Sequence, residues 1–137
     1  MRTPHNRQLN VQQQNAVIEE SQACEIAHWR NSPAPLALRT AALQHGLDWS
    51  KLVVLDLEIN YPGMPNLFGM LLTGDERFIR FYIDADERHE IIFGIDCWED
   101  VTDQQNLNKH NPGIGMGKGA IAIKLLRQFN ASDTNDN

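Results

Sequence analysis

The sequence predicts an α+β domain: an antiparallel β-meander of about four strands with two N-terminal helices and one C-terminal helix packed on it. Residues 67–98 contain three apolar, aromatic-rich runs separated by two polar turns, which is typical of a meander. The segments before and after them repeat apolar side chains at helical spacing. Because the 137 residues show neither an internal repeat nor a domain boundary, we expect a single domain over residues 1–137.

Two helices are expected before the sheet. Residues 10–30 have the apolar period of an amphipathic helix, and residues 1–9 before them are polar and expected to be disordered. Ser32 and Pro33 are typical of a helix N-cap and first helical residue, so a short second helix is predicted to follow them. Its predicted buried stripe consists of Leu36, Thr40, Leu43 and Leu47.

The first strand is predicted over residues 52–59, where apolar and polar side chains begin to alternate. One face of this strand is therefore expected to be buried and the other to be polar. The predicted buried face holds Val53, Leu55, Leu57 and Ile59, and the opposite face holds Asp56 and Glu58.

The remaining strands are predicted over residues 67–72, 77–83 and 90–98. A two-residue turn at Gly74 and Asp75 is expected to join the first two of them, and residues 84–89 form a longer second turn. The cross-strand pairs that follow are Met70 with Ile79, Phe68 with Phe81, Ile83 with Ile91, Phe81 with Phe93, and Ile79 with Ile95. The opposite face is predicted to carry Leu71, Phe78, Arg80, Tyr82, Ile92, Asp96 and Trp98, covered in part by a helix or by a partner.

The end of the chain combines a polar connection with one more helix. Residues 99–112 are acidic and rich in amides, residues 113–119 are rich in glycine, and residues 120–129 have the apolar period of a helix. Residues 130–137 are polar and are expected to be disordered.

The overall charge disfavours two classes of partner. Twelve basic and eighteen acidic residues give a net charge of −6, which opposes non-specific binding to nucleic acid or to an anionic membrane. The sequence shows neither the apolar core of a signal peptide nor an apolar window long enough to span a bilayer. A cytoplasmic location is the simplest expectation.

The cysteines do not predict a metal or catalytic centre. Cys24 and Cys97 belong to no CxxC pair, so neither a zinc ribbon nor a disulfide framework can be assembled from them. Cys24 and His28 lie four residues apart on the predicted first helix, but no second element supplies a paired spacing or a nucleophile turn. We therefore predict core cysteines, no metal, no cofactor and no catalytic residue.

The distribution of acids carries the main functional hypothesis. Residues 75–103 hold ten acidic and three basic residues, a local net charge of −7. Acids around aromatic anchors are typical of a site for a basic protein partner, because charge steers the encounter and buried rings supply affinity. The predicted partner-binding residues are Asp84, Asp86, Glu87, Glu90, Asp96, Trp98, Glu99, Asp100, Asp103 and Tyr82. The alternative interpretation is an ordinary acidic surface that keeps the protein soluble.

The glycine run offers an alternative function. Glycines before a helix can present backbone N–H groups to an anion, which would make this chain a phosphate-ligand-binding protein or a small transferase. The P-loop pattern fails, because Pro112 replaces its first glycine and Gly119 replaces its hydroxyl residue. The phosphate-binding residues would be Gly113, Gly115, Gly117 and Lys118.

The sequence thus predicts a small, acidic, non-enzymatic domain that binds a basic partner protein. In size and charge it is similar to toxin-neutralising immunity proteins and to secretion chaperones, whose partners are toxins and secreted substrates. No motif carries this likeness, so no family is assigned. A homodimer formed through an uncovered sheet face is a third alternative.

Overall fold

The computed structural model describes residues 10–104 and 118–135 and contains the predicted α+β meander. The strands form one antiparallel sheet in the order β1-β2-β3-β4. Their bounds are Val53–Asn60 for β1, Asn66–Leu72 for β2, Phe78–Ala85 for β3 and Ile91–Asp100 for β4. The helices are α1 (Val11–Asn31), α2 (Leu36–Gln44), the 3₁₀ turn η2 (Trp49–Lys51) and α4 (Lys118–Asn135).

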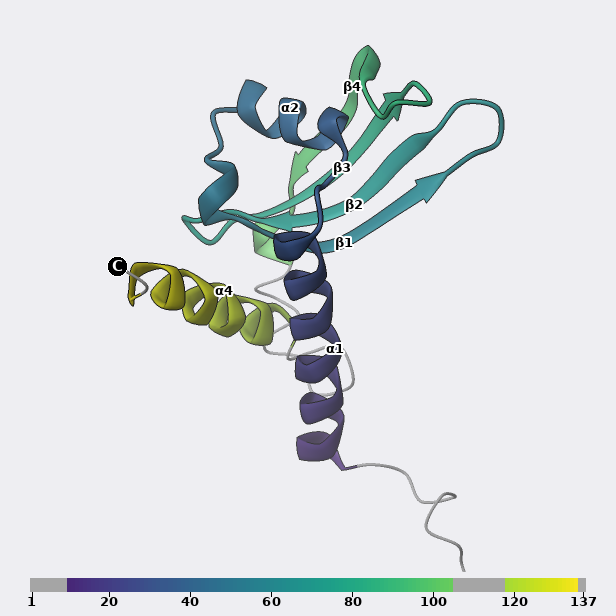
Figure 1. Ribbon diagram of the computed structural model, residues 1–137. Coiled ribbons are helices and arrows are strands. Elements are labelled where there is room, and N and C mark those ends of the chain that lie inside the picture. Colours follow the sequence, from purple (N-terminus) through teal and green to yellow (C-terminus); the bar gives the residue numbers. More distant parts are fainter. Residues whose placement is uncertain (1–9, 105–117, 136–137) are drawn as a thin grey trace, which may run out of the picture.

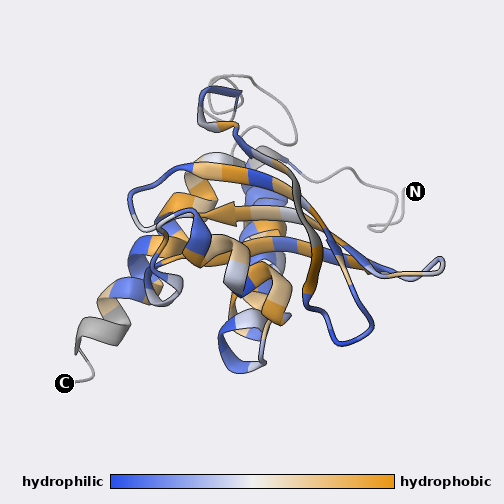
Figure 2. Cartoon of the chain, turned by 90° about the horizontal axis from the view of Figure 1, so that it is seen from above, coloured by the Kyte–Doolittle hydropathy of each residue, from blue (hydrophilic) through white to orange (hydrophobic). Residues whose placement is uncertain are grey.

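The helices cover the sheet from both sides (Figure 1). Helix α2 packs on one face, around Leu38, Leu67 and Phe81, and α1 with α4 packs on the other, around Phe78 and Leu126. Apolar residues follow the strands and polar residues fill the turns between them (Figure 2). The sheet therefore separates two cores, as expected for elements that bury one apolar face each.

Helix α1 begins where the sequence predicts. The Asn10 side chain accepts a hydrogen bond from the Gln13 backbone N–H at 2.7 Å, and the Gln13 side chain accepts one from the Asn10 N–H at 3.0 Å. This capping box satisfies two N–H groups that the first turn of a helix otherwise leaves without a partner. The prediction of a helix over residues 10–30 is confirmed. Its buried side is centred on Ile26, whereas Val17 and Cys24, which belong to the predicted apolar stripe, are exposed.

Helix α2 differs from its prediction in start and in orientation. Its N-cap is Pro35 rather than Ser32. Leu43 is 73% exposed and Leu36 is 42% exposed, so the predicted stripe of these residues is wrong. The buried side chains are Ala37, Leu38, Ala41 and Ala42. The small size of the three alanines lets the helix backbone lie close to the sheet. A backbone hydrogen bond of 2.5 Å joins the Ala37 N–H to the carbonyl of His89 in the β3–β4 turn.

Strand β1 contains a β-bulge that splits its apolar residues between the two cores. Val54 pairs with Leu71 and Asp56 pairs with Met70, so Leu55 is an extra residue on this strand. Val53 and the bulged Leu55 face α1 and α4, whereas Leu57 and Ile59 after the bulge belong to the α2 side. The predicted single buried face of β1 is therefore wrong, but Asp56 and Glu58 do share the opposite face from Leu57.

The β2–β3 turn is one residue longer than predicted. The Thr73 N–H donates to the Arg77 carbonyl at 2.9 Å, which leaves three loop residues, 74–76. Glu76 takes a left-handed φ of 67°, and its carboxylate binds the guanidinium of Arg127 on α4 at 2.7 Å. The extra residue moves the register by one, and the observed pairs are Leu67 with Ile83, Gly69 with Phe81, Leu71 with Ile79, Phe68 with Tyr82 and Met70 with Arg80.

A one-residue shift turns every side chain of a strand to the other face. Leu71 therefore lies in the α2 core, whereas Phe68 and Met70 face the opposite side. Two irregularities also shift the β3–β4 register, so the predicted pairs across this turn are wrong. The observed pairs are Ala85 with Ile91, Ile83 with Ile95, Tyr82 with Cys97, Phe81 with Trp98, Arg80 with Glu99 and Ile79 with Asp100.

Helix α4 extends past its predicted end at residue 129. Residues 130–135, which we expected to be disordered, continue the helix, while residues 1–9, 136 and 137 lie outside the described part of the chain. Asn130 explains part of this extension. Its side-chain amide donates to the Lys51 carbonyl at 3.1 Å and accepts from the Arg30 guanidinium at 3.1 Å. These hydrogen bonds to α1 and η2 thus keep Asn130 in the helix, although the polar composition of residues 130–137 predicts disorder.

Candidate binding surface on the open sheet face

Helices α1 and α4 cover only one end of their sheet face. At the covered end, Val53, Leu72 and Phe78 are buried. At the other end of the same face lies a hollow of about 530 Å³. It is lined by Asp56, Phe68, Gly69, Met70, Arg80, Phe81, Tyr82 and Cys97.

The floor of this hollow is apolar because of the β2–β3 register. The three-residue turn places Phe68 beside Tyr82 and Met70 beside Arg80, with Cys97 beside Tyr82 on β4. None of these five side chains is fully buried in the described structure. A sheet face that exposes adjacent rings and a thioether has contact area available for a partner.

Acids dominate the edge of the hollow. Burial raises the pKa of Asp56 above its ordinary value, and the nearby carboxylates of Glu58 and Glu25 raise it further. Among the described residues of the lining, Arg80 is the one base, and it is bound to Glu99 at 2.8 Å. The remaining charge of the described lining, on Asp56, is therefore negative.

The Asp56→Asn variant is expected to be more stable than the wild type at neutral pH. The folded protein disfavours ionised Asp56, because its folded pKa is raised above the ordinary value of 3.8. This cost appears as the pH rises through the raised pKa and is absent below about pH 3.8. Urea unfolding of both proteins at several pH values should show the gain at neutral pH and its disappearance in acid.

Asp75→Asn serves as a control of opposite sign. The Thr73 hydroxyl and the Arg77 guanidinium lower the pKa of Asp75, so its ionised form stabilises the fold. That contribution is present above its ordinary pKa of 3.8 and is lost as the pH falls toward the lowered value. Equal effects of the two substitutions at neutral pH would contradict the electrostatic environment assigned to Asp56.

The structure divides the two predicted aromatic anchors between the faces of the sheet. Tyr82 lines the hollow. Trp98 lies on the α2 side, where its ring stacks on His45 at a centroid distance of 4.4 Å and lies 6.2 Å from the ring of Phe81. The placement of Trp98 on the open face is therefore wrong, because its partner in the register is Phe81. Phe78, which was predicted on the same face as Tyr82, is 1% exposed because α1 and α4 cover that end of the face.

The predicted partner-binding acids form two groups rather than one surface. Asp84, Asp86, Glu87 and Glu90 lie at the β3–β4 turn, and Glu99, Asp100 and Asp103 lie at or beyond the other end of β4. Asp86 accepts the backbone N–H groups of Glu90 and Arg88, each at 2.9 Å, and these bonds help to lower its pKa. Asp100 accepts the Thr102 N–H at 2.9 Å. Both carboxylates thus stabilise local turns, and the Asp96 side chain lies outside the described structure.

Three residues that line the hollow, Asp56, Phe68 and Met70, were predicted to have other roles. The wrong turn length placed Phe68 and Met70 in the core, and Asp56, like Glu58 on the same face, was expected to be solvent-facing charge. The alternation of β1 does signal an acidic edge, since it puts two carboxylates on one face. The sequence of β1 itself contains no pattern that predicts the bulge orienting these two carboxylates.

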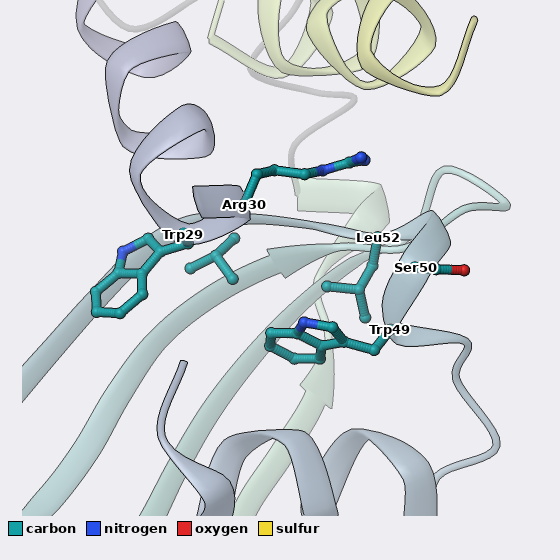
Figure 3. A pocket seen from close by; sticks show the side chains of 6 residues that line it. Trp29, Arg30, Trp49, Ser50 and Leu52 are labelled. Atoms are coloured by element: carbon teal, nitrogen blue, oxygen red, sulfur yellow. The ribbon is translucent and has the colours of Figure 1, made fainter. Parts of the chain in front are cut away.

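A second hollow, of about 210 Å³, lies where α1 ends and β1 begins (Figure 3). The indoles of Trp29 and Trp49 lie on two sides of it, and the Arg30 side chain is also part of its lining. The Arg30 guanidinium lies 5.5 Å from the ring centroid of Phe129. Because its volume is less than half that of the hollow on the open sheet face, this second hollow offers less basis for recognition.

The described residues provide no site for phosphate binding or for cysteine or metal chemistry. Gly113, Gly115 and Gly117 lie outside the described residues, and of Lys118 only the backbone, at the start of α4, is described. Cys24 is exposed and Cys97 is half-buried, both as free thiols, so the prediction of core cysteines is wrong. Within residues 10–104 and 118–135, no group of three or more His, Cys, Asp or Glu side chains is arranged to hold a metal ion. Among the helices of these residues, none has the length and apolar character that crossing a membrane requires.

The candidate site is accordingly the hollow on the open sheet face, with an apolar floor and an acidic edge. Its definition comes from geometry and charge alone, since no protein-family model, curated protein or solved structure matches the chain.

Proposed function

We propose that this protein is a non-enzymatic binding domain that engages a basic partner protein through the hollow on the open sheet face. The observation that supports this function is the combination of a 530 Å³ apolar hollow with an acidic edge, on the half of the sheet face that α1 and α4 leave uncovered. A partner that fits it offers an apolar side chain for the floor and Lys or Arg for the edge.

The environment of Asp56 indicates which charge a partner should carry. Its ionised form is disfavoured by burial and by neighbouring acids, so a cation brought close to it by a partner would relieve an existing electrostatic cost. An acidic partner would increase that cost. Electrostatic complementarity therefore favours a basic segment and opposes an acidic one.

Three synthetic peptides of on the order of 18 residues provide the test. All share the same apolar residues at helical spacing, and their polar positions are all Lys, all Glu or all Gln. Fluorescence anisotropy should show that the Lys peptide binds most tightly and that its affinity falls between low salt and about 0.15 M ionic strength. The Glu peptide should not bind.

Two matched variants locate the binding surface. Tyr82→Ala removes a ring from the hollow and is expected to weaken binding of the Lys peptide roughly tenfold. Leu43→Ala removes an exposed apolar side chain from α2, across the sheet, and should leave the affinity unchanged. Similar affinity for the Lys and Glu peptides, or an equal loss in both variants, would rule out the proposed function at this site.

A further inference from the structure

A third hollow, of about 500 Å³, lies on the side of helix α1 that faces away from α4. The described residues that line it all belong to α1: Val17, Glu20, Ser21, Cys24, Glu25 and His28. Helix α4 packs against a different side of α1, where Lys124 binds Glu19 at 2.9 Å and Ile26 is buried. In an α-helix, Cys24 and Ile26 point in nearly opposite directions, so the stripe at Val17 and Cys24 is available on the side away from α4.

The hollow on α1 and the hollow on the sheet each have an acid in their lining, and the two acids lie near each other. Glu25 lines the hollow on α1, Asp56 lines the hollow on the sheet, and the Glu25 carboxylate is close enough to raise the pKa of Asp56. The N-terminal half of α1 also projects from the same side of the sheet that α4 lies on (Figure 1). Helix α1 and the open half of the sheet thus form two walls of one corner.

We infer that this corner receives a basic amphipathic helix of the partner protein, which packs beside α1 and on the open sheet face. The inference rests on the proposed function and names the form in which the partner is bound. A helix at this position would extend the layer that α1 and α4 already form on this face. Its apolar side would contact Tyr82 on the sheet and Val17 on α1, and its Lys or Arg side chains would lie near Asp56 and Glu25.

Charge favours a partner helix over a second copy of this chain. The stripe on α1 includes Glu20 and Glu25, and the sheet edge includes Asp56. A second copy that presented its own α1 or its own hollow here would bring these acids against each other. A basic helix supplies the opposite charge on both walls.

The experiment compares three forms of the Lys peptide: unmodified, locked as a helix by a hydrocarbon staple on its polar face, and interrupted by two central prolines. The stapled form should bind at least about tenfold more tightly than the proline form, because the bound conformation is then already formed. Val17→Lys should weaken binding of the stapled form roughly tenfold by placing a like charge on the α1 wall. Leu36→Lys, the same type of change on α2, should have no effect.

Alkylation of the two native thiols reports which walls the peptide covers. Cys24 lies on the α1 wall and Cys97 on the sheet wall. Mass spectrometry of iodoacetamide-treated protein therefore measures the alkylation rate of one thiol on each wall. With the stapled peptide at about ten times its Kd, both thiols should react roughly tenfold more slowly.

The outcomes separate the two proposals. Protection of Cys97 alone, full affinity in Val17→Lys, or equal binding of the proline form would overturn the helix inference and leave the proposed function standing. Absence of binding by every form of the Lys peptide would overturn both. A protein that is dimeric in solution and becomes monomeric in Val17→Lys would assign the corner to a second copy and overturn the partner helix.

Discussion

Gly69→Ala is expected to lower the free energy of unfolding by about 3 kcal/mol. A Cβ atom at Gly69 would overlap the carbonyl oxygen of Asp56 and lie 2.6 Å from the Asp56 carbonyl carbon and 3.0 Å from the Leu57 Cα. These are backbone atoms next to the β1 bulge, so no side-chain rotation can relieve the overlap. The strand pair must separate or the bulge must rearrange.

Gly46→Ala is the matched control for this prediction. Gly46 has a positive φ of 75°, but nothing lies within 4 Å of the added Cβ. It should therefore cost only about 1 kcal/mol, the expense of a left-handed backbone for a residue with a side chain. Urea unfolding of both variants measures the difference. A Gly69→Ala protein no less stable than Gly46→Ala would show that β1 does not approach β2 as described.

Phe78→Ala is expected to have the largest effect on stability, a loss of about 3–5 kcal/mol. The Phe78 side chain is 1% exposed and packs in the core between the sheet, α1 and α4. Its removal leaves a cavity at the point where both helices contact the sheet. Thermal or urea unfolding should show the loss directly.

Tyr82→Ala is the comparison on the same strand and the same face. Tyr82 is half-buried and lines the hollow rather than the core, so its removal should cost about 1 kcal/mol of stability or less. The two variants thus distinguish the covered end of this face from the open end. If Tyr82→Ala destabilised the fold as much as Phe78→Ala, the hollow would be part of the core and unsuited to a partner.

The predictable part of the fold follows from local sequence patterns. The alternation in β1, the aromatic-rich runs of β2 to β4 and the helical periods of α1 and α4 specify each element and its order, and the antiparallel meander follows from its short turns. The capping box at Asn10 is local as well, which explains why α1 begins where its pattern does.

Some of the errors depend on contacts between distant residues. The β1 bulge requires the space that Gly69 leaves on the next strand. The β2–β3 turn is a local error, because its three-residue loop is held by hydrogen bonds of Thr73 with Glu76 and Arg77. The helical period of α2 fits both a buried stripe of leucines and a buried stripe of alanines. Which of the two is buried depends on how closely the helix approaches the sheet.

The candidate site shows the functional consequence of a one-residue error. A two-residue turn buries Phe68 and Met70 in the core, whereas the observed three-residue turn places them beside Arg80 and Tyr82. The sequence analysis identified acidic charge and Tyr82 as features of a partner site. The position of that site depended on the register, which moved it from the turns to the open half of the sheet.

The most direct test of the central claim is a titration of the ¹⁵N-labelled protein with the Lys peptide, followed by two-dimensional NMR. The largest chemical-shift changes should occur at the backbone amides of Gly69, Tyr82 and Cys97, with little change in α2 or at Glu87 in the β3–β4 turn. Changes concentrated at Glu87 and its neighbours, or on the outer side of α2, would contradict the assignment of the binding surface to the open sheet face.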